Sequence, residues 1–140
     1  MGTVVLDSSI LIALLDPEDA HHAAAAEVVR GVRHDSIRIL LPVSVLAEVL
    51  VGAHRQGPER VSHAERFVDA IADEVRVIDR PIARAAAAVR AAHPAIRLPD
   101  ALVLATGQIV AADAVYTGDK RWRAVDPRVR VVGADGTMGR

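Results

Sequence analysis

The apolar positions of this 140-residue chain form short continuous runs that alternate with longer segments of helical spacing. Five runs rich in Val, Ile and Leu have the length of strands: 3–6, 37–41, 75–78, 114–117 and 130–132. Continuous apolar runs, as opposed to alternating ones, are typical of strands that are covered on both faces, as in a parallel sheet.

Capping residues and prolines mark six predicted helices, at 8–15, 19–34, 43–56, 58–74, 81–93 and 99–112. Pro58, Pro81 and Pro99 each stand in a first helical turn, where proline is tolerated, and Asp19 is the expected cap of the second helix. Strands that alternate with helices predict an α/β fold, a three-layer sandwich with a central five-stranded parallel sheet flanked by helices. We expect one domain over residues 1–132 and a flexible tail over 133–140, which contains three glycines.

Composition excludes several classes of function. Hydrophobic residues make up 51% of the chain, enough for a core, but only Phe67, Tyr116 and Trp122 are aromatic, too few for stacking successive bases. The absence of cysteine excludes disulfides, thiol nucleophiles and zinc fingers. A net charge of −1 provides no general attraction for nucleic acid, so a polyanionic substrate needs local cations. Neither a membrane span nor a secretory signal is recognisable, and we therefore expect a cytoplasmic protein without membrane partners.

Three acidic residues stand alone in apolar runs. Asp7, Glu48 and Asp100 are the only charged residues of segments 1–15, 41–53 and 98–112, respectively. Ionisation of a carboxylate drawn toward the interior is costly without a partner, and the nearby sequence offers no Lys or Arg. Each also has a structural interpretation: Asp7 as a helix cap and Asp100 as a first-turn acid. Glu48 fits such an interpretation less well, because it lies in mid-helix with apolar neighbours.

Taken together, the carboxylates predict a metal site. Asp7 and Asp119 lie just past the ends of predicted strands. Glu48 and Asp100 lie in early turns of helices that fit the same edge of the sheet, where ligands of parallel α/β sheets bind. One like-charged pair at about 4 Å costs about 4 kcal/mol at an effective dielectric of 20, so the cluster requires bound cations or raised pKa values. Ligation by oxygen alone selects Mg²⁺ or Mn²⁺, and magnesium keeps positions open for phosphate oxygens and water.

Four segments of the chain resemble the motifs of PIN domains, specifically of VapC-type toxin ribonucleases. They are VVLDSSILIALL with Asp7 and Ser9, SVLAEVLVGA with Glu48, LPDALVLATG with Asp100, and TGDKRW with Thr117 and Asp119. The resemblance extends from Val4 to about Val132. Trp122 stands where phenylalanine is more usual and Gly107 where alanine is common, and neither departure touches the chemistry.

The resemblance implies a Mg²⁺-dependent endoribonuclease, with Mn²⁺ as a possible substitute, that hydrolyses RNA by a metal-activated water. It further implies a homodimer that acts as a toxin, is silenced by a small VapB-like antitoxin, and cleaves structured RNA such as tRNA or ribosomal RNA. Asp7, Glu48, Asp100 and Asp119 would be the catalytic metal ligands, with Ser9 and Thr117 orienting them through their hydroxyl groups.

Several assignments keep an alternative. Lys120, Arg121 and Arg123 either hold backbone phosphates or belong to a turn whose tryptophan, Trp122, caps the core, and we favour the core for Trp122. The pair His21–His22 is expected to face solvent. The alternatives for the whole protein are a PIN-fold RNA-binding module with little or no catalysis and a PIN nuclease of RNA processing outside any toxin–antitoxin pair.

Overall fold

The computed structural model describes residues 2–133 and 138–139 and confirms the predicted α/β fold. In chain order the elements are β1 (Thr3–Leu6), α1 (Ser8–Leu15), α2 (His22–His34), β2 (Arg38–Pro42), α3 (Val43–Gln56), α4 (Pro58–Ile71), β3 (Glu74–Arg76), α5 (Arg80–Ala92), α6 (Leu98–Ile109), β4 (Ala114–Thr117), the short 3₁₀ helix η1 (Lys120–Ala124), β5 (Val129–Val132) and β6 (Met138–Gly139). None of the helices in these described parts has the length and apolar content that a membrane span needs.

The sheet has the strand order β3-β2-β1-β4-β5-β6. Its first five strands are parallel: Val4 of β1 aligns with Ile39 of β2 on one side and with Ala114 of β4 on the other. The strand order reverses between β1 and β4, and in open α/β sheets ligands bind at the carboxyl ends of strands at such a point. The topology therefore places the residues that follow β1 and β4 at the expected binding edge.

A sixth strand extends the predicted five-stranded sheet. Met138–Gly139 pairs antiparallel with β5, with Val131 opposite Gly139. The flexible tail that we expected over 133–140 otherwise falls on residues 134–137 and 140, which lie outside the described residues.

Several predicted boundaries differ from the structure by one to three residues; α6, for example, ends at Ile109 and not at residue 112. Two of the differences have identifiable reasons. Helix α2 begins at His22 and not at Asp19, because the Asp19 carboxylate accepts the backbone N–H of His21 (2.8 Å) in a turn before the helix. Helix α4 ends at Ile71 and not at residue 74. There, Asp73 exchanges two hydrogen bonds of 2.8 Å with the backbone of Ile39, which ties the chain to β2 and starts β3 at Glu74.

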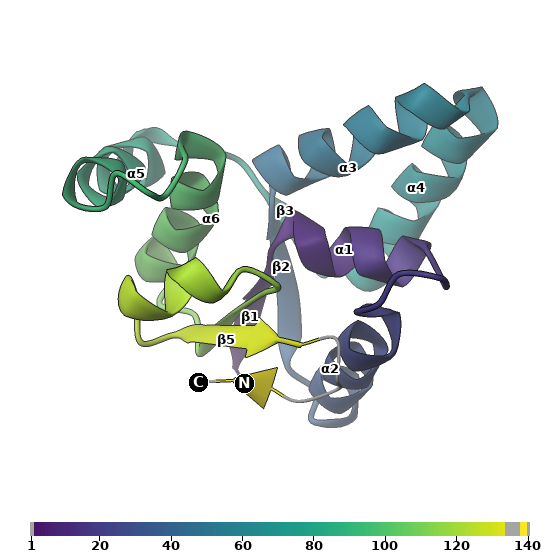
Figure 1. Ribbon diagram of the computed structural model, residues 1–140, viewed down its shortest axis with the longest axis horizontal. Coiled ribbons are helices and arrows are strands. Elements are labelled where there is room, and N and C mark those ends of the chain that lie inside the picture. Colours follow the sequence, from purple (N-terminus) through teal and green to yellow (C-terminus); the bar gives the residue numbers. More distant parts are fainter. Residues whose placement is uncertain (1, 134–137, 140) are drawn as a thin grey trace.

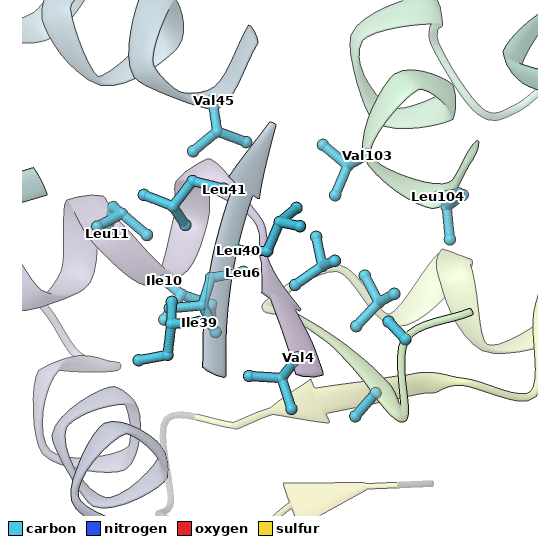
Figure 2. Close-up of a cluster of buried hydrophobic side chains, with 14 of the residues drawn as sticks. Val4, Leu6, Ile10, Leu11, Ile39, Leu40, Leu41, Val45, Val103 and Leu104 are labelled. Atoms are coloured by element: carbon cyan, nitrogen blue, oxygen red, sulfur yellow. The ribbon is translucent and has the colours of Figure 1, made fainter. Parts of the chain in front are cut away.

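Helices cover the sheet on both sides (Figure 1). Helices α1 and α2 lie on one side, α5 and α6 on the other, and α3 and α4 form a hairpin that extends outward beside α1. Side chains of β2 alternate accordingly: Ile39 and Leu41 point toward α1, whereas Leu40 points to the opposite side of the sheet (Figure 2). The core is aliphatic apart from Trp122, which is 1% exposed, so the prediction of a core tryptophan is confirmed.

Two glycines occupy positions where a side chain would be strained or would clash. Gly57 joins α3 to α4 with φ +117°, a conformation that side chains rarely adopt. Gly107 of α6 lies so close to β4 that an added Cβ would come within 2.5 Å of Val115 Cγ2. Close packing of α6 on β4 thus explains why this chain has glycine at 107.

Candidate active site

The four predicted carboxylates line one pocket of about 830 Å³ at the carboxyl edge of the sheet. Among the residues around it are Asp7, Ser9, His21, Glu48, Arg97, Asp100, Asp119, Lys120 and Arg121. The structure therefore brings together acids from the ends of β1 and β4 and from α3 and α6. Arg123 is exposed and does not line the pocket.

Asp7 is the most firmly positioned of the acids. It leaves β1 with its backbone N–H bonded to the carbonyl of Tyr116 in β4 (2.9 Å). Its Oδ1 accepts the Ser8 N–H (2.7 Å) and so caps α1, which makes the capping interpretation correct as well. Its Oδ2 accepts the hydroxyls of Ser9 and Thr117, both at 2.9 Å.

The same two hydroxyls hold the loop that follows β4. Ser9 Oγ accepts the N–H of Gly118 (3.0 Å), and Thr117 Oγ1 accepts the N–H of Asp119 (3.1 Å). Each hydroxyl thus donates to Asp7 and accepts from the loop, which fixes both relative to each other. Burial nevertheless raises the pKa of Asp7, against the opposing effect of these hydrogen bonds.

Glu48 and Asp100 lack comparable support. Glu48 Oε1 is buried and has no hydrogen-bond partner among the described residues. Burial raises the pKa of Glu48, and the charges of Asp7 and Asp100 raise it further. The pKa of Asp100 is also raised, first by burial and then by the charge of Asp7. Neither acid forms an ion pair within the part of the chain that the structure describes.

Arg97 is a site residue that the sequence analysis missed. It is exposed, precedes α6 as its cap and lines the pocket, where its charge lowers the pKa of Glu48 and of Asp100. The expectation that no basic residue stands near these acids is therefore wrong. Arg97 lies one position before the apolar run 98–112, so a wider window around Asp100 would have included it.

Asp119 differs from the other three acids because it already has a cationic partner. Its carboxylate accepts Arg121 Nη2 at 2.6 Å on Oδ2 and Arg121 Nε at 3.0 Å on Oδ1. Oδ1 also accepts the Arg121 backbone N–H (2.9 Å) and so caps η1. These hydrogen bonds from Arg121 lower the pKa of Asp119.

Contrary to expectation, His21 and His22 do not face solvent. His21 is half-buried and lines the acidic pocket, and its Nδ1 is buried without a hydrogen-bond partner among the described residues. His22 is also half-buried, with Nδ1 2.7 Å from the carbonyl oxygen of Ala13. The turn between α1 and α2 brings the His22 ring against α1 and the His21 side chain to the pocket, which sequence spacing alone does not indicate.

The chemistry of the pocket fits a hard divalent cation held partly through water. Within residues 2–133 and 138–139, no three Asp, Glu or His side chains are close enough to form a ready-made metal cage. The acidic groups are all oxygen donors, however, and Glu48 has a buried oxygen without a partner. Mg²⁺ usually binds through one or two carboxylates and keeps several waters, which matches acids that share a pocket without touching.

Sequence comparison decides the family. A family model described as PIN domain matches residues 4–127. The chain belongs to the PIN domain family. The resemblance drawn from the four motifs is thereby confirmed, and the four carboxylates of this PIN domain lie within the matched region. No protein with a curated description matches the sequence.

Solved structures share the fold of this PIN domain. A toxin–antitoxin complex from Klebsiella pneumoniae has a TM-score of 0.72 and 22% identity, covering 90% of this chain and 94% of its own. VapC20 of Mycobacterium tuberculosis, described as a sarcin–ricin loop cleaving toxin, has a TM-score of 0.70 and 18% identity, with coverages of 86% and 93%. DNA-bound VapBC from Salmonella typhimurium has a TM-score of 0.69 and 16% identity, with coverages of 96% and 99%.

Proposed function

We propose that this PIN domain is a divalent-metal-dependent endoribonuclease that acts as the toxin of a toxin–antitoxin pair. The observation that carries the nuclease assignment is the partnerless buried Oε1 of Glu48 in a pocket shared with Asp7 and Asp100. A fold stabilised only by its own contacts gains nothing from three acids whose pKa values are all raised by burial, and in Glu48 and Asp100 also by the charge of Asp7. Such an arrangement is useful when a cation binds among them.

Asp7, Glu48 and Asp100 would hold Mg²⁺ or Mn²⁺, and Asp119 is the fourth acid available to it. Held by these residues, the ion would supply a water molecule of lowered pKa and positive charge for the developing charge at phosphorus. Ser9 and Thr117 keep Oδ2 of Asp7 in place, as second partners do for metal ligands in general. Arg97 and Lys120 line the same pocket and supply the positive charge that an RNA backbone needs there.

The toxin role draws support from the similar structures. All three belong to toxins or toxin–antitoxin complexes, and one is named for cleaving the sarcin–ricin loop. By this analogy the partners of the chain are an RNA substrate and a small VapB-like antitoxin, and the toxin is a cytoplasmic homodimer.

Cleavage of RNA by the antitoxin-free protein tests the nuclease assignment. We expect cleavage of a mixed RNA substrate in Mg²⁺ or Mn²⁺, none in EDTA, and a loss of at least ~100-fold in Asp100→Asn. Asp69→Asn, which changes an exposed aspartate of α4, is the matched control and should cleave like the wild type. Unchanged cleavage in Asp100→Asn would refute the site, and RNA binding without any cleavage would support the binding-module alternative.

Growth of a host that expresses the chain tests the toxin role. Expression should arrest growth, Asp100→Asn should relieve the arrest, and co-expression of a small gene adjacent to the toxin gene should restore growth. Harmless expression of a protein that cleaves RNA in vitro would instead favour a nuclease of RNA processing.

A further inference from the structure

The pairing of Asp119 with Arg121 competes with the role of Asp119 as a metal ligand. Both carboxylate oxygens accept hydrogen bonds from the guanidinium group, at 2.6 Å on Oδ2 and at 3.0 Å on Oδ1. A fixed positive charge at this carboxylate disfavours a divalent cation there. Asp7, Glu48 and Asp100 have no such partner among the described residues, so the fourth acid alone is held by a cation.

Arg121 is placed where an RNA phosphate would reach it. Its side chain is 60% exposed, against 25% for Asp119, and it lines the pocket together with Lys120 and Arg97. Its charge also acts on Asp100, which places the guanidinium within the electrostatic reach of the other acids. The planar guanidinium group binds phosphate in the same two-pronged way in which it binds a carboxylate.

We propose that Arg121 is a latch that occupies Asp119 in the RNA-free protein and releases it when an RNA phosphate takes its place. This inference rests on the proposed function and adds a regulatory step to it. The released carboxylate becomes available to the metal, so RNA and metal strengthen each other's binding. An RNA backbone is favoured over an acidic protein side chain, because successive phosphates can engage Lys120 and Arg97 as well.

The expected effect is modest because the pair is exposed. Exposed ion pairs restrain their partners weakly, so freeing Asp119 should tighten metal binding by about two- to fivefold. Linkage then requires that Mn²⁺ raise the affinity for RNA by the same factor by which RNA raises the affinity for Mn²⁺.

A double-mutant cycle on Mn²⁺ binding, measured by calorimetry without RNA, separates the latch from a general charge effect. We expect Arg121→Gln to bind Mn²⁺ about two- to fivefold more tightly than the wild type. In an Asp119→Asn background the gain should be clearly smaller, because only the effect of the Arg121 charge on Asp100 remains. Arg123→Gln, which removes a neighbouring exposed charge outside the pocket, is the control and should leave the affinity nearly unchanged. An equal gain with and without Asp119, or no gain at all, would overturn the latch.

A second titration tests release by RNA. The probe is a 2′-O-methyl RNA octamer, which is checked for integrity after the titration and whose own Mn²⁺ binding is subtracted. The octamer should raise the Mn²⁺ affinity of the wild type about two- to fivefold and that of Arg121→Gln hardly at all. An octamer that leaves the affinity of the wild type unchanged would overturn release by RNA and point to an acidic protein partner. Failure of the proposed function looks different: Mn²⁺ would then not bind, or would bind Asp100→Asn equally well, and the latch would fall with it.

Discussion

Neutralising Glu48 should stabilise the metal-free protein, although it removes a residue of the proposed site. The substitution Glu48→Gln keeps the shape of the side chain and removes its charge. The pKa of the Glu48 carboxyl group is raised by burial and by the charges of Asp7 and Asp100. The amide also gives the buried Oε1 position an uncharged occupant. Arg97 is the one nearby charge that favours the ionised form.

The magnitude follows from these charges. Two like charges roughly 7 Å apart repel by about 2 kcal/mol at an effective dielectric of 20 and by about 0.6 kcal/mol in bulk water. Glu48 is half-exposed, so each pair lies between these limits. Burial and two repulsions favour the neutral side chain, and the charge of Arg97 and a hydrogen bond from Ser8 oppose them. The balance leaves about 1 kcal/mol in favour of Glu48→Gln and a rise in Tm of roughly 3–4 °C.

Thermal and chemical unfolding in EDTA at pH 7 measure this difference, with Glu65→Gln, an exposed glutamate of α4, as the matched control. The pKa of Glu48 in the folded protein lies above its ordinary value of 4.5, so the folded state binds a proton at Glu48 more tightly than the unfolded state does. The stability that this proton gives is fully present below pH 4.5 and is lost as the pH rises through the raised pKa. The advantage of Glu48→Gln should therefore shrink toward pH 4. At pH 7, saturating Mn²⁺ should reduce the difference in stability between Glu48→Gln and the wild type, because the ion binds the wild type more tightly.

A destabilised Glu48→Gln protein in EDTA would refute this reasoning, as would a gain no larger than that of Glu65→Gln. A gain that persists undiminished at pH 4 would show that its cause is not the charge of Glu48. Either result would remove the electrostatic support for a cation site among these acids.

Substitutions at two further positions, Thr117 and Gly107, test the contacts that support the site. Thr117→Val removes a fully buried hydroxyl that donates to Asp7 and should lower the free energy of unfolding by about 2 kcal/mol in chemical denaturation. Thr117→Ser keeps the hydroxyl and should lower it by about 1 kcal/mol. Equal losses of stability in the two variants would contradict the role of the hydrogen bond. Gly107→Ala places a Cβ within 2.5 Å of Val115 Cγ2 and should lower the free energy of unfolding by about 1–2 kcal/mol. In a Val115→Ala background this loss of stability should largely disappear. A loss that persists there would rule out the contact with Val115 as its cause.

The sequence predicted best those elements whose ends are marked by local chemistry. Asp7 both ends β1 and caps α1, and Gly57 followed by Pro58 separates α3 from α4, so these boundaries agree with the structure. The end of α4 was missed because it depends on Asp73 reaching the backbone of Ile39, 34 residues earlier in the chain. Contacts of this kind are tertiary and leave no local pattern.

The same distinction applies to the site. The isolation of Asp7, Glu48 and Asp100 in apolar runs indicated their shared pocket, because parallel strands and the helices that follow them deliver residues to one edge of the sheet. The charge environment could not be predicted in this way. Arg97 and His21 reach the pocket through the start of α6 and the turn before α2, and the partner of Asp119 is decided by a side-chain conformation.

The four acids of the proposed metal site differ in how firmly hydrogen bonds hold them. Asp7 is held by Ser8, Ser9 and Thr117 without any cation, so in the proposed site it would be a fixed ligand where β1 and β4 end. Glu48 and Asp100 have no comparable partners and carry raised pKa values, which means that a bound cation would relieve an existing repulsion. Relief of this repulsion would therefore add to the affinity of the proposed site for the ion. Asp119 would be a further ligand, available only when Arg121 does not occupy its carboxylate.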